Sequence, residues 1–430
     1  MQITVEGYKT IATAQTLDFD GLTILSGANS SGKSSFMQPF LILKQTIENH
    51  YDSGVLELYG ENVKLTDSSQ VISKVPGFTK KKFSLTHKGD TGCSKVVYRH
   101  KRGTGLEVDS VSSTDKSMPE GIFLELGMKS EVIEKALPDD KFRFIKELAL
   151  ERNLKPQWKV IKNKCFLNAE YSFNKSDSIP IKAGIKPAAG IENFVTSLIH
   201  VSGLRGQPER AYKIASTEQV FPGAFEKYVA SIISNWSKFT KHESKYKELK
   251  IQLEQLGLAS NIITKKVDET NVEIQISRFK NSSSKDDCVN ISDVGFGVSQ
   301  TLPVLVALLV AKKNQYVYVE QPELHLHPKA QFKLASIITS ALKRGVKVIV
   351  ETHSSILIRG IQIAVVKGEL EAEKVSLNWF TQDEITGETN VSKAVLDEFG
   401  AFGDWPEDFD DITLKVEQMY LDAIEEKMFE

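Results

Sequence analysis

Apolar residues follow two spacings along this chain, and each spacing predicts a different kind of element. Near-continuous apolar runs at Leu22–Leu25, Tyr316–Val319 and Lys347–Glu351 predict strands, and the alternation in Gln2–Val5 predicts another strand. Apolar positions at helical spacing between Gly223 and Leu258 predict helices with solvated charged faces. These segments together predict an α/β fold.

Period-two alternation also fills the stretch from Lys80 to Val111. Glycine turns at Gly89–Gly92 and Arg102–Gly105 divide it, so it predicts an antiparallel sheet inserted after the first helix. Two basic clusters, Lys80–Lys82 and Arg99–Arg102, lie in this sheet. They fit charged hairpin ends or a contact with a phosphate backbone, and we favour hairpin ends.

The first apolar strand leads into a complete G-x-x-x-x-G-K-S loop, Gly27–Ser34. A helix is expected over Ser35–Glu48, with a kink at Pro39 or a restart at Phe40. Strand, glycine-rich turn and helix are the context that a phosphate-binding loop requires, because backbone N–H groups and the helix dipole hold the phosphates. The chain is therefore predicted to bind a nucleoside triphosphate.

Three later segments carry polar residues suited to the same site. Ile291–Gln300 is a glycine-rich turn that opens an apolar helix, which makes it a second candidate anion site. Glu320 ends one apolar strand, where an acid would hold Mg²⁺ through water, and His353 follows another. In an open α/β sheet, ligands gather at the carboxyl ends of the strands, so we expect these residues to meet there.

Other polar residues give weaker signals. Gln70 lies in a polar loop where a glutamine that senses Mg²⁺ would be placed. The segment around Arg205 and Arg210 fits a surface turn with two solvated arginines. His325 and His327 lack the further partners of a metal site, and we interpret them as structural.

Composition narrows the class of protein. The chain has 430 residues, a net charge of −2 and three cysteines far apart in sequence, which indicates neither a strongly basic nucleic-acid binder nor a disulfide framework. The longest apolar run, Leu302–Ala311, is too short to span a bilayer, and the N-terminus has no signal region. We expect a cytoplasmic protein with no membrane contact.

The motifs GANSSGKSS, ISDVGFGVSQTLP, VYVEQPELHLHP and VIVETHS together resemble those of ABC-type ATPases of the RecF, SMC and OLD kind. In that family two heads clamp ATP between the Walker motifs of one head and the signature loop of the other. The segments Arg205–Arg210 and Gly400–Phe409 resemble a subgroup of AAA-family ATPases with a short C-terminal domain. The resemblance implies a P-loop ATPase head with inserted antiparallel β and helical segments and no long coiled coil; it covers residues 76–190 poorly.

The resemblance also implies ATP and Mg²⁺ as cofactors and assigns roles by position. Glu320, Gln321 and His353 would be catalytic, and Ser34, Glu320 and Gln70 would hold Mg²⁺. The nucleotide would contact one head's loop and the partner head's signature segment, through Asn29, Ser30, Ser31, Gly32, Lys33, Ser34 and Ser35 on one side and Ser292, Gly295, Gly297, Ser299 and Gln300 on the other.

Gln321 departs from the family pattern, which has a glutamate that orients the attacking water. A glutamine positions water but cannot take its proton, so a loss on the order of 10²–10⁴-fold in hydrolysis is expected. We favour slow turnover, with ATP acting as a switch. The alternative is that Glu323 or Glu351 replaces the missing glutamate.

We divide the chain into four segments. Residues 1–75 form the N-terminal half of the head, 76–285 an inserted β and helical lobe, 286–385 the C-terminal half of the head, and 386–430 a short C-terminal segment. The stretch from His353 to Glu430 is too short for the nuclease domain of OLD proteins, and long coiled-coil arms are not expected. The chain is thus expected to be an ATPase without its own effector.

ATPase subunits of the bacterial antiphage systems Septu and PARIS are similar in kind. They are oligomeric sensors that hold or release a separately encoded nuclease. The resemblance therefore implies a homodimer or higher oligomer that acts as a nucleotide-gated scaffold for such an effector. The alternatives are a stand-alone RecF-like ATPase that binds DNA in repair or recombination, and a platform that no longer hydrolyses ATP.

Overall fold

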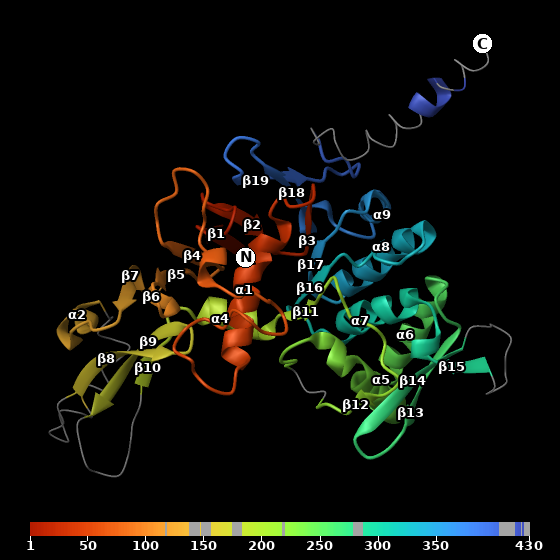
Figure 1. Cartoon of the computed structure of the whole chain (residues 1–430), viewed down its shortest axis with the longest axis horizontal. Helices are drawn as coiled ribbons and strands as arrows, with labels where there is room; N and C mark the ends of the chain where they lie inside the picture. The colour runs from red at the N-terminus through yellow and green to blue at the C-terminus, as the bar shows by residue number, and fades with distance from the viewer. Residues whose placement is uncertain are drawn as a thin grey trace.

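The computed structural model describes residues 1–116, 118–136, 147, 156–173, 183–216, 220–277, 287–403, 418–422 and 424. Two six-stranded sheets and the helices between and beside them make up most of this part of the chain (Figure 1). The expected α/β fold is confirmed. Of the tail segment Gly400–Phe409, residues 404–409 lie outside the described residues.

The central sheet has the strand order β11-β16-β17-β3-β18-β19 and is parallel except for its last pair. Glu320 pairs with Glu351, and Glu351 pairs with Leu25, so the predicted strand ends meet at one edge. The strands are β3 (Leu22–Gly27), β11 (Ile199–Val201), β16 (Tyr316–Glu320), β17 (Lys347–Glu351), β18 (Val375–Gln382) and β19 (Thr389–Val395).

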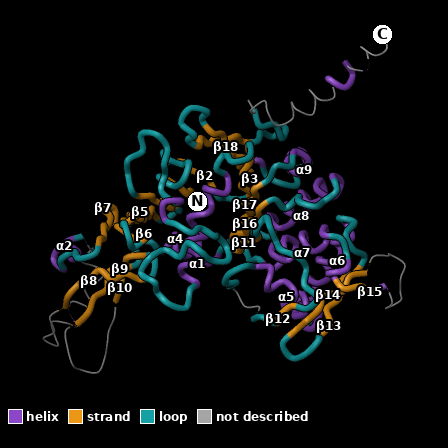
Figure 2. The backbone as a smooth tube through the Cα atoms, viewed as in Figure 1, coloured by secondary structure: helices purple, strands orange, loops and turns teal. Residues whose placement is uncertain are grey.

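The second sheet is antiparallel, in the order β2-β1-β4-β5-β6-β7. The sheet predicted after the first helix is confirmed, but the N-terminal strand also joins it, since β1 pairs with both β2 and β4. A three-stranded sheet of β8, β9 and β10 and the short helix α2 (Ser130–Lys135) lie at its far side (Figure 2). The bounds are β1 (Gln2–Glu6), β2 (Gln15–Asp18), β4 (Lys82–Lys88), β5 (Gly92–Lys101), β6 (Gly105–Asp115), β7 (Met118–Glu125), β8 (Pro156–Asn163), β9 (Phe166–Phe173) and β10 (Ala183–Ile185).

Helices α1 (Lys33–Glu48) and α4 (Ala189–Ser197) lie between the two sheets (Figure 1). Their aromatic side chains join one core, in which the Phe194 ring lies 5.4 Å from Phe40 and 5.0 Å from Tyr316, measured between centroids. Helix α1 continues through Pro39 without the predicted restart, because Pro39 removes only one backbone donor while most of the helix is buried. This core fixes the helix that follows the phosphate-binding loop.

The other face of the central sheet is covered by α7 (Phe296–Val310), α8 (Pro328–Lys343) and α9 (Ser355–Val366). The same core continues into a helical lobe that contains the helices predicted between Gly223 and Leu258 (Figure 2). That lobe consists of α5 (Val229–Lys238), α6 (Glu243–Gln255), β12 (Tyr212–Lys213), β13 (Asn261–Lys266), β14 (Asn271–Ser277) and β15 (Cys288–Asn290). Single 3₁₀ turns lie at Ser68–Gln70, Phe225–Tyr228, Thr240–His242, Ile291–Asp293 and Ala372–Lys374.

The central sheet contains strands from all four segments into which we divided the sequence. Strand β11 lies in the segment 76–285 and β19 in the segment 386–430, yet both pair within the central sheet. Both strands were missed because β11 has only three residues and β19 is mostly exposed. The longest helices of the described chain, α1 and α8, have 16 residues each, so this part contains no long coiled coil. None of the described helices is long and apolar enough to cross a membrane.

Candidate nucleotide-binding site

The phosphate-binding loop connects β3 directly to α1. Gly27 has φ 140°, and a Cβ there would lie 2.2 Å from the carbonyl oxygen of Phe380 in the neighbouring strand. Gly32, at φ 101°, caps the helix. Lys33 Nζ donates to the carbonyl oxygens of Gly27 (3.1 Å) and Ala28 (2.6 Å), so its ammonium group lies over the loop where phosphates would bind. Burial lowers the pKa of Lys33, and the nearby charge of Glu351 opposes that shift.

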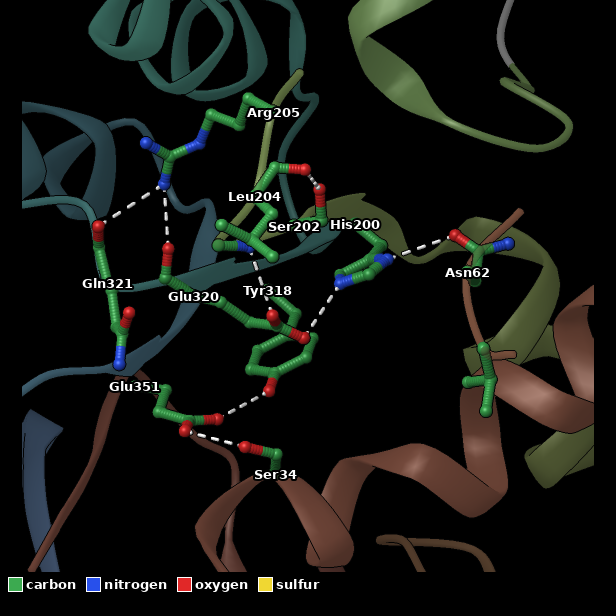
Figure 3. A network of polar contacts seen from close by, with 12 residues as sticks. Ser34, Asn62, His200, Ser202, Leu204, Arg205, Tyr318, Glu320, Gln321 and Glu351 are labelled. Atoms are coloured by element: carbon green, nitrogen blue, oxygen red, sulfur yellow. Dashed lines mark hydrogen bonds and ion pairs between the residues drawn. The ribbon is translucent and has the colours of Figure 1, made fainter. Parts of the chain in front are cut away.

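Two glutamates end the neighbouring strands beside this loop, and their contacts differ (Figure 3). Glu351 accepts hydrogen bonds from Ser34 Oγ (2.7 Å) and Tyr318 OH (2.9 Å). Glu320 accepts from His200 Nε2 (3.1 Å) and from the backbone N–H of Gly203 (3.0 Å). The sequence-predicted acid is therefore bonded on the β11 side of the sheet, and the carboxylate in contact with Ser34 is Glu351.

The two carboxyl groups also differ in their pKa. Burial raises the pKa of Glu351, and its donors offset this only in part. Burial acts on Glu320 in the same direction, but the bond to His200 and the Gly203 N–H lower its pKa overall. His200 itself is buried, stacks on Tyr318 at 5.2 Å and contacts Asn62 Oδ1 through Nδ1 at 2.9 Å.

Arg205 connects the end of β16 to the start of α7. Its Nη1 donates to the carbonyl oxygen of Gln300 (2.9 Å) and its Nη2 to that of Glu320 (2.7 Å). Burial lowers the pKa of this guanidinium to about 10. The interpretation as a surface turn with two solvated arginines is wrong for Arg205, which is buried, and holds for Arg210, which is exposed and pairs with Asp293 at 2.7 Å.

The glycine-rich turn before α7 leads directly into that helix, as the sequence predicted. Gly295 is the N-cap, it is exposed, and nothing lies within 4 Å of a Cβ built on it. Ser292 is bound to Asn290 and Ser299 Oγ donates to the Phe296 carbonyl, whereas Gln300 is buried and donates to the Gly206 carbonyl at 2.7 Å. Gly297 packs against His325, since a Cβ there would lie 3.2 Å from the His325 carbonyl oxygen.

Gln321, Glu323 and His353 lie at the same strand ends. Gln321 has φ 43°, and its backbone N–H donates to the Glu351 carbonyl at 2.7 Å. Glu323 is buried, which raises its pKa, and its Oε1 accepts the backbone N–H of His353 at 2.9 Å. Desolvation and the charge of Lys33 lower the pKa of the exposed His353 imidazole, which favours its neutral form. The structure thus places these three residues at the strand ends that adjoin the phosphate-binding loop.

Gln70 is the last residue of the 3₁₀ turn Ser68–Gln70 and takes part in the cap of that turn. Its Oε1 accepts from the backbone N–H groups of Thr66 (3.0 Å) and Asp67 (3.3 Å), so that oxygen is already engaged in a capping box. A groove of about 350 Å³ beside it is also lined by Lys9 and Thr10. Among the described residues, no group of three or more His, Cys, Asp or Glu side chains could hold a metal ion by itself.

The basic clusters of the antiparallel sheet are paired with acids. Lys82 and Arg99 both contact Asp109 at 2.7 Å, and Lys80 contacts Glu6 at 3.0 Å. These pairs agree with charged hairpin ends and give no separate support to a phosphate-backbone contact. His327 caps α8 by accepting from the Lys329 N–H, which agrees with its interpretation as a structural residue.

His200, Tyr318 and Asn62 were not predicted from the sequence. Glu351 was predicted only as a possible replacement for the glutamate that is missing at Gln321. Tyr318 had a readable signal, because it precedes Glu320 by two residues and strand residues two apart share a face. His200 lies on a strand of only three residues, and Asn62 in a loop, so no periodic pattern marked them.

A family model described as "AAA ATPase domain" matches residues 1–358. Among solved structures, an SMC head bound to the C-terminal winged-helix domain of ScpA matches at 11% identity over 92% of this chain and 98% of that chain, with a TM-score of 0.47. An SMC head domain from Thermotoga maritima (9%, 91% and 97%, TM-score 0.36) and one derived from Pyrococcus furiosus (10%, 92% and 96%, TM-score 0.43) match similarly. No curated protein matches significantly.

Proposed function

The chain belongs to the AAA ATPase domain family, and from that premise we propose that it is a nucleotide-gated switch that binds MgATP and hydrolyses it slowly. The observation that carries this proposal is the single constellation at one sheet edge, where Lys33, Ser34, Glu351 and Glu320 lie around the phosphate-binding loop. Backbone N–H groups from Asn29 to Ser35 would bind the phosphates.

Mg²⁺ would bind beside Ser34, with a carboxylate at the end of β16 or β17 as its acidic partner. When bound, the ion would neutralise charge that develops between the β- and γ-phosphates. Gln321 would position the attacking water without accepting its proton, and the exposed His353 would contact the γ-phosphate. Slow turnover follows from this set, because a neutral glutamine stands where a base is expected.

The exposed loop before α7 would act on a second copy of the chain. Its outward-facing residues Gly295 and Phe296, together with Ser292, Gly297 and Ser299, would cover the nucleotide held by that copy. ATP would then favour a homodimer or a higher homo-oligomer. Arg205, bonded to both Gln300 and Glu320, would link that loop to the strand ends within each copy.

We further propose that this switch controls a separately encoded effector, a nuclease, in bacterial antiphage defence. The support for this finer role is the resemblance of the motif set to the ATPase subunits of Septu and PARIS. Co-purification of a nuclease subunit whose release depends on ATP would support the role. Salt-sensitive binding of DNA ends or gaps by the ATPase alone would instead favour the RecF-like alternative.

The test of the proposed switch is ATP turnover and molar mass of the purified protein, with and without MgATP, beside Lys33→Ala. We expect slow turnover and ATP-dependent assembly in the unaltered protein and neither in Lys33→Ala, because the lysine would reach the β- and γ-phosphates. The exposed Lys367 provides the matched control, since Lys367→Ala removes a lysine from the end of α9. If nucleotide binding and assembly do not depend on Lys33, the proposed function is wrong.

A further inference from the structure

A cavity of about 420 Å³ lies in the helical lobe, away from the phosphate-binding loop. Its walls come from α5, the turn Thr240–His242, the start of α6 and the end of α7. Lys312 and Gln315, which precede β16, complete them. The cavity therefore lies at the start of β16, whereas the candidate nucleotide site lies where that strand ends.

Part of the cavity wall is apolar. The aromatic rings of Phe221 and Trp236 line it, together with Ile232 and Val310. Both rings are held in the core of the lobe, since Phe221 is 5% and Trp236 4% exposed. Small-molecule sites are usually concave, partly apolar and roughly 300–1,000 Å³ in volume, and this cavity fits that description. Its rings offer contacts to a planar ring of a ligand.

The rest of the wall is basic. Four basic side chains line the cavity: Lys241, His242, Lys245 and Lys312. In the part of the chain that the structure describes, no Asp or Glu lines it or forms an ion pair with any of these four. Glu243, next to His242 in sequence, pairs with Lys247 at 2.6 Å instead. The cavity therefore carries positive charge without a compensating carboxylate.

Lys245 lies among these groups and is half-buried. Its Nζ lies 3.5 Å from the carbonyl oxygen of Val310 and 5.8 Å from the ring centroid of Trp236. An ammonium group has three donor protons, so two remain for a ligand. Burial lowers the pKa of Lys245, and the positive charges of Arg344 and Lys312 lower it further.

The start of α6 adds positive charge on the same side of the cavity. His242 is the N-cap of this 13-residue helix, and its side chain does not cap the helix. The partial positive charge of the helix N-terminus is therefore close to the lysines. Burial and the charges of Lys241 and Lys245 lower the pKa of His242. These groups repel one another, and an anion bound among them would remove that repulsion.

Helix capping accounts for only part of this cluster. Lys245 donates to the last turn of α7, as does Arg344, whose Nη2 contacts the Leu308 carbonyl at 2.7 Å. Lys241 and Lys312 have no such role, yet they reach the same cavity from two different segments. Their convergence on an apolar cavity is what an anion-binding site requires.

We propose that this cavity binds a phosphate ester of mononucleotide size, with its ring against Phe221 and Trp236 and its phosphate among Lys241, Lys245 and Lys312. A phosphate monoester carries a charge of about −1.5 to −2 at pH 7 and three acceptor oxygens, which match three ammonium groups. The cavity shares no lining residue with the phosphate-binding loop, so its occupancy does not depend on the proposed function.

The test is isothermal titration calorimetry on the full chain carrying Lys33→Ala, which weakens competition from the phosphate-binding loop. The probes are the four ribonucleoside monophosphates, adenosine and inorganic phosphate. We expect at least one monophosphate to bind more tightly than inorganic phosphate and than adenosine, and its affinity to fall as salt is added, because salt screens the partly exposed charges. If none of the four monophosphates binds, the proposed site is wrong.

Variants of neighbouring lysines locate the binding. In Lys312→Gln we expect the affinity for the monophosphate to fall about 10-fold or more, as for loss of one charge-assisted hydrogen bond. Lys313→Gln is the matched control, because Lys313 is the next residue, is also exposed and does not line the cavity. Equal affinities in the two variants overturn the proposed location.

Two further measurements keep the result interpretable. Lys312→Arg retains the positive charge and should retain most of the affinity, which separates loss of charge from misfolding. A short single-stranded oligonucleotide supplies the same phosphates from a nucleic acid. If it binds more tightly than every monophosphate and loses that advantage in Lys312→Gln, the cavity is a nucleic-acid contact and the assigned ligand is wrong. If inorganic phosphate binds as tightly as the monophosphates, the proposed ring contact is wrong.

Discussion

The loop before α1 and the loop before α7 share one local design, a glycine-rich turn that opens a helix, but their surroundings differ. The first is packed against the chain's own strands, with Gly27 touching β18 and with Lys33 and Ser34 bonded nearby. The second has an open Gly295 followed by Phe296, whose side chain is 51% exposed. A helix opening supplies only backbone donors, so the remaining chemistry of the first site comes from its neighbours. Under the proposed function, that of the second would come from another copy of the chain.

The largest expected effect on stability is that of Gly27→Ala, which adds one methyl group to the loop before α1. In Gly27→Ala, the new Cβ meets the Phe380 carbonyl at 2.2 Å, and alanine is strained at φ 140°. We expect the free energy of unfolding to fall by about 3 kcal/mol or more, from backbone strain and overpacking together. Urea denaturation measures this loss.

Gly295→Ala is the matched control for that variant. Its φ is −61°, and nothing lies within 4 Å of the added Cβ. Only the preference of an N-cap for glycine over alanine is lost, which costs at most about 1 kcal/mol. Equal losses in the two variants would show that the packing of the two loops does not differ.

The next largest effect is expected for Arg205, which bonds both to helix α7 and to the end of strand β16. In Arg205→Ala, the carbonyls of Gln300 and Glu320 lose a buried charged donor. We expect unfolding free energy to fall by about 2–3 kcal/mol, the usual cost of unpaired buried groups. The measurement is again urea denaturation.

Arg210→Ala removes the other arginine of the same segment. Its partner Asp293 and the arginine itself are largely exposed, so the pair contributes less than about 1 kcal/mol. A loss in Arg210→Ala as large as that in Arg205→Ala would contradict the idea that burial makes Arg205 the connecting residue.

The sequence predicted the parts of the site that lie within one motif. The G-K-S loop, the strand Lys347–Glu351 and the helix opening at Gly295 needed only local pattern, and all three are in place. The two sheets were recognised from periodicity, but strand partners were not, because pairing of Gln2–Glu6 with Lys82–Lys88 depends on contacts some eighty residues apart.

The contacts of the two strand-end glutamates were not predictable in this way. The sequence motifs indicated Glu320 as the Mg²⁺ ligand, because it ends the apolar strand that carries the Walker B pattern. Strand β17 lies between β16 and β3, so Glu351 ends the strand next to the phosphate-binding loop and bonds to Ser34. The role of His200 likewise depends on a three-residue strand whose partner lies more than a hundred residues later.

The smallest expected effect tests the outward-facing loop. In Phe296→Glu, a carboxylate is added to the first turn of α7, where negative charge stabilises a helix by about 0.3–1 kcal/mol. Folding is therefore retained, while the same charge repels the phosphates of a nucleotide brought by a second copy. We expect nucleotide affinity of the single chain to stay unchanged and ATP-dependent association, measured by molar mass against concentration, to weaken about 10-fold, the equivalent of 1.4 kcal/mol.

Tyr51→Glu is the control for that change, because Tyr51 is 66% exposed and lies beyond the C-terminal end of α1, at the opposite end from the phosphate-binding loop. It adds the same charge and removes an aromatic ring, yet should leave association as it is. Weaker association in both variants would reflect net charge, and weaker nucleotide binding in Phe296→Glu would mean that the α7 loop faces the chain's own nucleotide. Either result would contradict the proposed difference between the two loops. In that proposal the loop before α1 binds the chain's own nucleotide, and the loop before α7 contacts the nucleotide of a second copy.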